Sequence, residues 1–159
     1  MITCKFEDEG KGNLRHVTVD ALLVEDDKIL IVKRSAEELL GSGKYCLPGG
    51  FLDRDETTRQ AVIREIREET GYKAKVKECF FVNDDPKREG EDRQNVSFIY
   101  IMEPIKKVGE SDSEVDSIHW FKLDEIKDKD SFAFDHYKTI MLYKAYLKEK
   151  FDLPVIGNK

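Results

Sequence analysis

Apolar and polar residues alternate along the first half of the chain in a way that is typical of β-strands. Residues 16–26, HVTVDALLVED, alternate and then run apolar, and residues 28–34, KILIVKR, follow directly. A period of two is the mark of a strand, and Asp26 and Asp27 between the two segments mark a turn. We therefore expect a β-hairpin here, followed by a loop over residues 35–50 that is rich in glycine.

Later segments repeat the strand-like composition. The segments expected to form strands are residues 73–84, 95–103 and 117–126, the last of which ends in a turn. A charged loop, DDPKREGEDRQ, separates the first two. Apolar and β-branched residues bounded by charged or turn residues indicate strands of this length.

The residue pattern predicts a helix in each of two longer segments. The first runs from about Thr57 to Thr70, and Gly71 stands just past its end, where glycine is the usual stop. The second covers residues 135–151, with Asp135 as the candidate N-cap. Its apolar side is expected to consist of Ile140, Met141, Tyr143, Ala145, Tyr146 and Leu147. Strands interleaved with two helices predict an α+β fold, in which helices pack on a mixed sheet.

Composition narrows the class of protein. The 159 residues fit a single domain, residues 1–159, and no linker or repeat divides them. Apolar residues make up 40% and charged residues 38%, with a formal net charge of −6. Such an acidic chain is a poor partner for nucleic acid or an anionic membrane, which require clustered Lys and Arg. It has no run as long as a membrane span and no apolar signal core near residue 1. We expect a soluble cytoplasmic protein in which Cys4, Cys46 and Cys79 are free thiols.

The first helix carries an unexplained electrostatic cost. Glu65, Glu68 and Glu69 fall within ~100° of one another on a helical wheel, and like charges at this spacing destabilise a helix. The adjacent arc holds the residues expected to face the core, which are Val62, Ile63, Ile66 and Thr70. A divalent cation would remove the repulsion, and carboxylate oxygens suit Mg²⁺, or Mn²⁺ as the alternative. The competing interpretation is an ordinary acidic face in solvent.

The context of these glutamates separates the two interpretations. Gly50 is followed after five residues by Glu56, and after seven more by the run from Arg64 to Gly71, REIREETG. This spacing resembles the signature of the Nudix hydrolases, and Tyr72, where an aliphatic residue is usual, departs from it at a packing position. The preceding YCLPGG and the flanking strands also fit the family. The resemblance implies the Nudix fold, a mixed β-sheet packed between helices in an α/β/α sandwich. It also implies hydrolysis of a nucleoside diphosphate linked to a further group.

The resemblance assigns roles to residues of the signature. Glu65, Glu68 and Glu69 are implied to be ligands of the catalytic Mg²⁺, and the carbonyl of Gly49 to be a backbone ligand. The Gly49–Gly50 turn also lets the backbone approach closely where a Cβ would intrude.

Glu56 and Arg64 match a pair that orients the loop on the helix; the alternative for Arg64 is an exposed helix residue. The general base is left open between Glu68, Glu69 and Glu114. Glu114 belongs to SEVDSIHWFKLDEI, which resembles a late segment of the family, although a plain loop glutamate is the alternative.

Positive groups must meet the phosphates of such a substrate. Arg34, at the end of the second strand, and Arg88 and Arg93, in the charged loop, are the candidates for substrate binding. That loop and the later segment FAFDHYKT are similar to stretches of short Nudix enzymes of the ADP-ribose pyrophosphatase type, although a charged loop is often merely solvated. Three aromatic residues offer a stacking surface for a base or, alternatively, belong to the core: Phe81, Tyr100 and Trp120.

The leading hypothesis is therefore a Mg²⁺-dependent Nudix hydrolase acting on ADP-ribose or a similar nucleotide-derived small molecule. The rival within the enzymes is a pyrophosphohydrolase of nucleoside triphosphates, including non-canonical or damaged ones. A rival of another class is a catalytically silent nucleotide sensor, against which the intact signature speaks. Many relatives are dimers, so a homodimer is an open option for this chain.

Overall fold

The computed structural model describes residues 2–38, 40–88 and 93–157. The elements follow one another as β1 (Ile2–Lys5), β2 (Lys11–Leu14), β3 (Val17–Glu25), β4 (Lys28–Arg34), β5 (Tyr45–Cys46), β6 (Gly49–Phe51), α1 (Thr58–Thr70), β7 (Tyr72–Asn83), β8 (Val96–Lys107), β9 (Val115–Lys122), the 3₁₀ turn η1 (Lys129–Ser131), α2 (His136–Lys148) and β10 (Val155–Ile156). The predicted hairpin, both helices and the later strands are thereby confirmed, with bounds that differ by a few residues.

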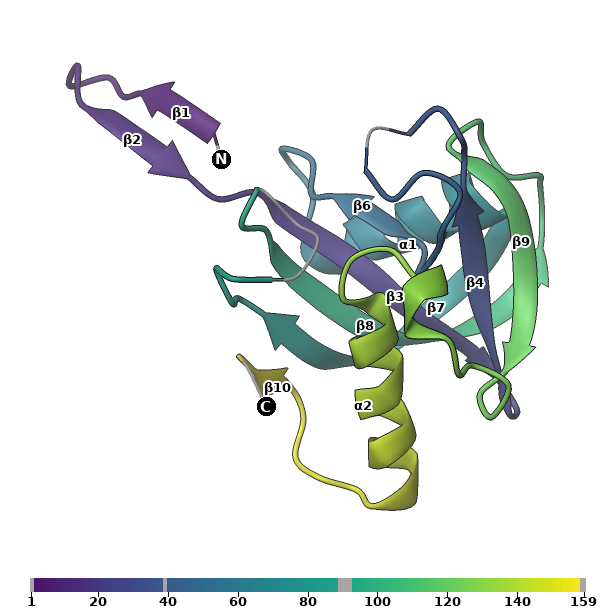
Figure 1. Ribbon diagram of the computed structural model, residues 1–159. Coiled ribbons are helices and arrows are strands. Elements are labelled where there is room, and N and C mark those ends of the chain that lie inside the picture. Colours follow the sequence, from purple (N-terminus) through teal and green to yellow (C-terminus); the bar gives the residue numbers. More distant parts are fainter. Residues whose placement is uncertain (1, 39, 89–92, 158–159) are drawn as a thin grey trace.

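One mixed sheet forms the centre of the molecule. Its strands lie in the order β10-β7-β8-β3-β4-β5, with β6 paired to β3 and β9 paired to β4. β3 runs parallel to β8 and β10 parallel to β7, whereas the hairpins β3–β4 and β7–β8 are antiparallel. Helix α1 lies behind the sheet and α2 in front of it in Figure 1, which confirms the expected α+β sandwich.

The sheet is buried on both faces, which explains the apolar run in β3. Ala21 and Leu23 pack with Val62 of α1, and Leu22 packs with Ile140 of α2. A strand with one solvated face would alternate throughout, whereas a strand covered on both faces reads as a continuous apolar stretch.

Helix α1 begins and ends at residues with capping geometry. Thr57 and Gln60 form a capping box, in which the Thr57 side chain accepts a hydrogen bond from the Gln60 N–H and the Gln60 side chain accepts one from the Thr57 N–H. Gly71, with φ of 70°, closes the helix and donates its N–H to the carbonyl of Arg67 at 3.0 Å. Both ends of the helix agree with the sequence pattern.

The loop between β8 and β9 is tied to the C-terminal end of α1. The N–H groups of Val108 and Gly109 donate to the carbonyl of Gly71 at 2.7 and 3.1 Å, and the N–H of Asp112 donates to the carbonyl of Glu68 at 3.0 Å. A Cβ at Gly71 would lie 2.1 Å from the carbonyl oxygen of Gly109, so only glycine permits this approach. The helix end and the loop therefore form one unit.

The expectation that the Asp135 side chain caps α2 is wrong. Asp135 is the N-cap residue, but within the described residues its carboxylate makes no capping hydrogen bond and instead accepts from Arg88 and Asn83. The apolar side of α2 is also narrower than predicted, because Ala145 and Leu147 are exposed.

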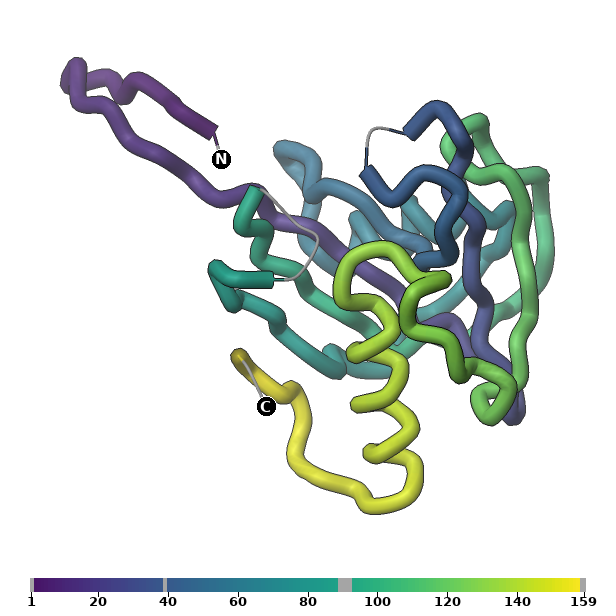
Figure 2. Tube along the Cα trace, viewed as in Figure 1, coloured from purple at the N-terminus to yellow at the C-terminus, as the bar shows by residue number. Residues whose placement is uncertain are grey.

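A short hairpin, β1–β2, precedes the sheet and was not predicted from the sequence. Figures 1 and 2 show that it projects away from the rest of the molecule before the chain enters β3. Its strands are mostly exposed and too short to display a clear apolar period. The cysteines at 4, 46 and 79 are free thiols, as expected. In the part of the chain that the structure describes, no helix has the length and apolar character to cross a membrane.

Candidate active site

The three glutamates of α1 differ widely in their surroundings. Glu69 is buried, with 5% of its surface exposed, Glu65 is largely covered, and half of the Glu68 side chain is in solvent. Glu65 and Glu68 line a cavity, whereas Glu69 is buried, so this stripe lies at the edge of the core as the helical wheel predicted. A purely solvated acidic face would expose all three, so that alternative does not describe this helix.

Glu69 is held against the glycine turn that precedes α1. The N–H of Gly49 donates to Glu69 Oε2 at 2.8 Å. Gly49 has a φ of 155°, and a Cβ there would lie 2.1 Å from the carbonyl oxygen of Val19 on the neighbouring strand. Burial raises the pKa of Glu69 well above its ordinary value, and the Gly49 hydrogen bond only partly opposes this.

Gly50 makes room for the second carboxylate. A Cβ at this position would lie 2.5 Å from Glu65 Oε1 and 2.8 Å from Oε2, closer than real Cβ contacts. Burial raises the pKa of Glu65, while the neighbouring Arg64 lowers it. The two adjacent glycines thus serve two different carboxylates, one through an N–H group and one through the absence of a side chain.

The Gly50→Ala variant is expected to reduce kcat/KM by roughly 10- to 100-fold, because the added methyl group must displace the Glu65 carboxylate by a substantial fraction of an ångström. Steady-state assays of ADP-ribose hydrolysis, together with a thermal unfolding curve of each protein, test this prediction. Gly109→Ala is the matched control, since within the described part of the chain no atom lies within 4 Å of its added Cβ. Equal activity of the two variants would contradict the close contact between Gly50 and Glu65.

Arg64 connects the loop after β6 to the helix. Its Nη2 and Nε donate to the two carboxylate oxygens of Glu56 at 2.7 and 3.2 Å, and Nη2 also donates to the carbonyl of Phe51 at 3.1 Å. Glu56 accepts a further hydrogen bond from the N–H of Asp53 at 2.9 Å. The Arg64 hydrogen bonds hold the pKa of Glu56 below its usual range, against a smaller opposing effect of burial. The structure therefore brings the predicted pair together.

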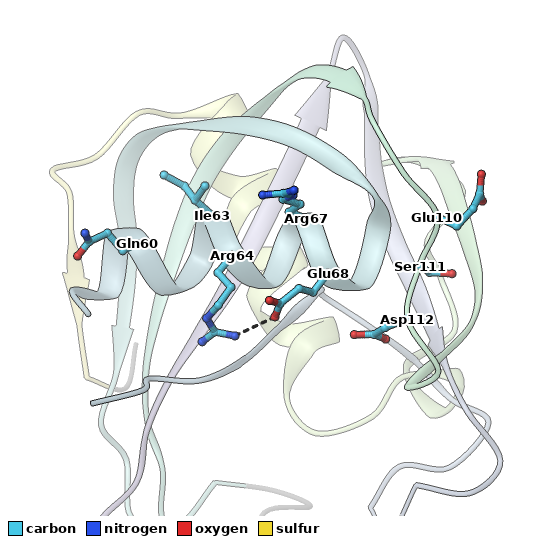
Figure 3. A pocket seen from close by; sticks show the side chains of 8 residues that line it. All are labelled: Gln60, Ile63, Arg64, Arg67, Glu68, Glu110, Ser111 and Asp112. Carbon is cyan, nitrogen blue, oxygen red and sulfur yellow. Dashed lines mark hydrogen bonds and ion pairs between the residues drawn. The ribbon is translucent and has the colours of Figure 1, made fainter. Parts of the chain in front are cut away.

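The remaining nitrogen of Arg64 faces the glutamates. Nη1 lies 2.7 Å from Glu65 Oε1 and 3.0 Å from Glu68 Oε2; Figure 3 shows the second of these contacts. Among the described residues, no three His, Cys, Asp or Glu side chains are already arranged as a closed ligand set. The donors nevertheless have the chemistry that a hard divalent cation prefers, because they are carboxylate oxygens carried on one arc of one helix. In the present arrangement Arg64 supplies the compensating positive charge.

Two acidic residues of the β8–β9 loop complete this region. Asp112 and Glu114 line the cavity together with Glu65 and Glu68, and the N–H of Glu114 donates to Asp112 Oδ1 at 3.1 Å. Burial and the charge of Asp112 raise the pKa of Glu114. Asp112 was not predicted, although it stands two residues before Glu114 and the loop ties it to Glu68.

A second hollow, of about 710 Å³, lies on the outer side of α1. Arg64, Glu68 and Asp112 line both this hollow and the cavity that contains Glu65 and Glu114, which is called the main cavity below. Figure 3 shows helix α1 and the β8–β9 loop on the two sides of the hollow. Ile63 lines this hollow and is 42% exposed, so the expectation that it faces the core is wrong.

The main cavity has a volume of about 560 Å³ and runs from the glutamates to the first turn of α2. The three arginines singled out from the sequence all line it. Arg34 is committed to the protein through Nε to the carbonyl of Leu40 at 2.9 Å and Nη2 to Glu38 Oε2 at 2.5 Å. Arg93 lies over the ring of Phe51, 5.6 Å from its centre. Residues 89–92 of the same charged loop lie outside the described residues.

Arg88 is placed differently, deep in the wall of the cavity. Only 5% of its side chain is exposed, and it grips Asp135 with Nη2 at 2.8 Å and Nε at 3.0 Å. Its Nη1 donates to the Ser97 hydroxyl at 2.6 Å. Burial of Asp135 acts to raise its pKa, but the interactions with Arg88, His136 and Asn83 together outweigh this, and the net shift is downward. Arg88 thus joins the β7–β8 loop to the start of α2.

The floor of the cavity contains a buried pair that was not predicted. His136 accepts the N–H of Leu47 on Nδ1 at 2.9 Å, so its neutral ring carries the proton on Nε2, 3.5 Å from Asp20 Oδ1. Burial lowers the pKa of His136 and raises that of Asp20. The sequence does hold a signal, because Asp20 is an acidic residue inside an apolar strand.

The aromatic residues considered for stacking belong to the core. Phe81 and Tyr100 are buried, and Trp120 packs edge-on against Tyr72 with ring centres 5.9 Å apart. Tyr72 itself packs against the α1 side of the core, in line with its interpretation as a packing position. The aromatic side chains that do line the cavity are Phe51 and Phe134.

Comparison with known proteins identifies relatives of this chain. The family described as "NUDIX domain" matches residues 14–143. An ADP-ribose pyrophosphatase of Methanocaldococcus jannaschii is 35% identical over 130 residues, which cover 82% of this chain and 73% of the relative.

Solved structures give the same fold. An ADP-ribose pyrophosphatase of Streptococcus suis superposes with a TM-score of 0.72 at 18% identity, covering 91% of this chain and all of the other. A bifunctional NMN adenylyltransferase/ADP ribose pyrophosphatase of Francisella tularensis, described as complexed with AMP and a Mn ion, matches with a TM-score of 0.64 at 30% identity. That match covers 87% of this chain and 42% of the Francisella chain.

Proposed function

The chain belongs to the Nudix hydrolase family, and on that premise we propose that it hydrolyses the diphosphate linkage of a nucleoside diphosphate derivative with Mg²⁺ as cofactor. The best candidate substrate is ADP-ribose, the substrate named for the Methanocaldococcus relative. The observation that carries the proposal is the set of three α1 carboxylates: Glu65 and Glu69 are fitted against the Gly49–Gly50 turn, and Glu65 and Glu68 line one cavity.

Glu65, Glu68 and Glu69, with the Gly49 carbonyl, would hold Mg²⁺ or Mn²⁺. The bound ion supplies charge neutralisation of the diphosphate and a more acidic water at neutral pH. The Francisella protein, a bifunctional enzyme of which this chain matches 42%, is described as complexed with AMP and a Mn ion, which agrees with a divalent metal and a nucleotide as ligands. Arg64 supports the site from outside by binding Glu56 and the Phe51 carbonyl, which keeps the turn on the helix.

A carboxylate of this site accepts the proton of the attacking water. Glu68 is half exposed and contacts Arg64, Glu69 is buried and accepts the Gly49 N–H, and Glu114 stands on the β8–β9 loop with a raised pKa. A general base is most effective when its pKa lies near the working pH, and the raised pKa of Glu114, which is not among the proposed metal ligands, suits this role better than an ordinary solvated carboxylate. Arg34 and Arg93 offer positive charge to the phosphates from the cavity wall, whereas Arg88 acts through Asp135.

A panel of nucleoside diphosphate derivatives and triphosphates, assayed with Mg²⁺ and with EDTA, tests the proposal. ADP-ribose is expected to give AMP and ribose 5-phosphate only when Mg²⁺ is present. If a nucleoside triphosphate released pyrophosphate with a higher kcat/KM than that for ADP-ribose hydrolysis, the triphosphate would replace ADP-ribose as the proposed substrate. Tight binding of ADP-ribose without turnover in Mg²⁺ would overturn the proposed hydrolysis.

A further inference from the structure

We propose that the part of the cavity beside the first turn of α2 is a subsite for an amino-bearing nucleobase. In this α2 subsite, Phe134 provides the stacking surface and Asp20 accepts a hydrogen bond from the exocyclic amino group. The inference rests on the proposed function, which supplies the nucleotide. It adds a preference for one class of nucleobase, which the glutamates at the phosphates cannot provide.

Phe134 stands out because of its backbone. Its φ is 54°, in the left-handed region, where bulky residues are outliers and cost free energy. The other described non-glycine residues with such angles are polar: Glu9, Asp26, Asp55 and Gln94. Phe132 and Ala133, just before it, are buried in the core, whereas Phe134 is half-buried and lines the cavity. The backbone therefore turns an aromatic ring towards the cavity at a cost.

Contacts on both sides hold this backbone conformation in place. The N–H of Ala133 donates to the carbonyl of Tyr45 at 2.8 Å, and Asp135 is gripped by the buried Arg88. The turn around Phe134 is thus fixed before and after the ring. A preorganised aromatic surface loses little freedom when a ligand stacks on it, which favours binding.

The neighbours of the Phe134 ring form a stiff wall. The guanidinium carbon of Arg34 lies 5.5 Å from the ring centre, and the His136 ring lies 5.4 Å away at 55°. Arg34 is itself held by Glu38 and the Leu40 carbonyl. Aromatic rings and arginine planes are the surfaces on which nucleobases stack, with little dependence on which base is present. Stacking here accounts for binding a base but not for choosing one.

Asp20 supplies the selection between nucleobases. It lies at the floor of the same cavity with 10% of its side chain exposed, and its carboxyl keeps an acceptor oxygen in either protonation state. His136 does not serve as an acceptor there, because Nδ1 already receives the Leu47 N–H and Nε2, which lies 3.5 Å from Asp20 Oδ1, bears the proton. Burial raises the pKa of Asp20, whereas the nearby His136 and Arg88 favour its ionised form, in which both oxygens are acceptors only. An exocyclic amino group, as in adenine or cytosine, then meets an acceptor, whereas the oxo group of hypoxanthine or uracil meets a second oxygen.

The position of Asp20 also suits a nucleotide whose phosphates lie at the glutamates. Asp20 on β3 pairs in register with Gly49 on β6, the residue that holds Glu69. Both residues line the one cavity, which continues to Glu65 and Glu68. A nucleotide can therefore reach both the α2 subsite and the carboxylates.

Calorimetric titration of the full chain with AMP, IMP and ribose 5-phosphate tests the subsite without any turnover. With Mg²⁺ present, wild type is expected to bind AMP at least about tenfold more tightly than IMP or ribose 5-phosphate. This comparison needs no variant, so it does not depend on the folding of altered proteins. Equal affinity for AMP and ribose 5-phosphate would overturn the subsite, and equal affinity for AMP and IMP would overturn the role of Asp20.

Variants assign the two effects to residues. Phe134→Leu should weaken AMP binding about tenfold and leave ribose 5-phosphate binding unchanged. Phe134→Tyr, which keeps an aromatic ring, should bind AMP as wild type does. Asp20→Asn should bring the AMP and IMP affinities together. Phe6→Leu, on the exposed β1–β2 turn, is the control. A Phe134→Leu protein indistinguishable from this control would overturn the stacking role. If AMP binds as expected while ADP-ribose is not cleaved, the proposed hydrolysis fails and the subsite stands.

Discussion

Replacement of Glu69 by Gln is expected to lower kcat by about 10²–10⁴-fold while the protein remains folded. The amide keeps an oxygen that can still accept the Gly49 N–H, so the turn stays in place. What the change removes is the negative charge at the buried end of the carboxylate set. Charge is the property that both a divalent cation and a proton-accepting role require.

The measurement is steady-state hydrolysis of ADP-ribose at saturating Mg²⁺, together with a thermal unfolding curve of each protein. Glu68→Gln should show a loss of the same order, whereas Glu78→Gln, on an exposed position of β7, should retain full activity. If both α1 variants kept wild-type turnover, the assignment of a metal site to this helix would be wrong.

Replacement of Asp135 by Ala is expected to reduce the free energy of unfolding by about 3–5 kcal/mol. The Arg88–Asp135 pair is almost entirely buried, and the variant would leave the guanidinium without its bidentate partner. The cost is therefore dominated by an uncompensated buried charge rather than by the loss of one hydrogen bond. Asp124→Ala, at an exposed position, should change stability by no more than about 0.5 kcal/mol.

The pH dependence of this difference has a definite sign. Because the pKa of Asp135 is lowered in the folded state, its ion pair contributes stability above the ordinary aspartate value of 3.8. That contribution is lost as the pH falls below 3.8 and through the lowered pKa. Denaturant unfolding of wild type and variant should thus converge at low pH, and a constant difference between pH 7 and pH 3 would contradict the assignment.

The parts of the molecule that repeat a local period could be predicted from the sequence. The strands β3 and β4 and the helix α1, with its caps Thr57 and Gly71, depend on spacing over a few residues. The gathering of Glu65, Glu68 and Glu69 on one arc follows from the same helical geometry. These features need no knowledge of what lies on the other side of the sheet.

The rest of the candidate site depends on contacts between distant segments. Asp112 reaches the cavity because its N–H binds the Glu68 carbonyl, and nothing in the loop sequence alone specifies that bond. Asp135 resembled a helix cap, but the buried Arg88 competes for its carboxylate and forms the stronger, bidentate contact. Phe134 faces the cavity because its own backbone adopts a left-handed conformation, whereas Phe81 and Tyr100 follow their strands into the core.

The hydrogen bonds that join the β8–β9 loop to Gly71 and Glu68 also bear on how chains of this fold diverge. The anchors at Val108, Gly109 and Asp112 use backbone groups only, so side chains between them are free to change without loosening the attachment. Residues inserted between Gly109 and Asp112 would leave the strands on either side undisturbed. A change in the length or composition of this loop would therefore alter the acidic rim of the cavity while the helix and sheet stay the same.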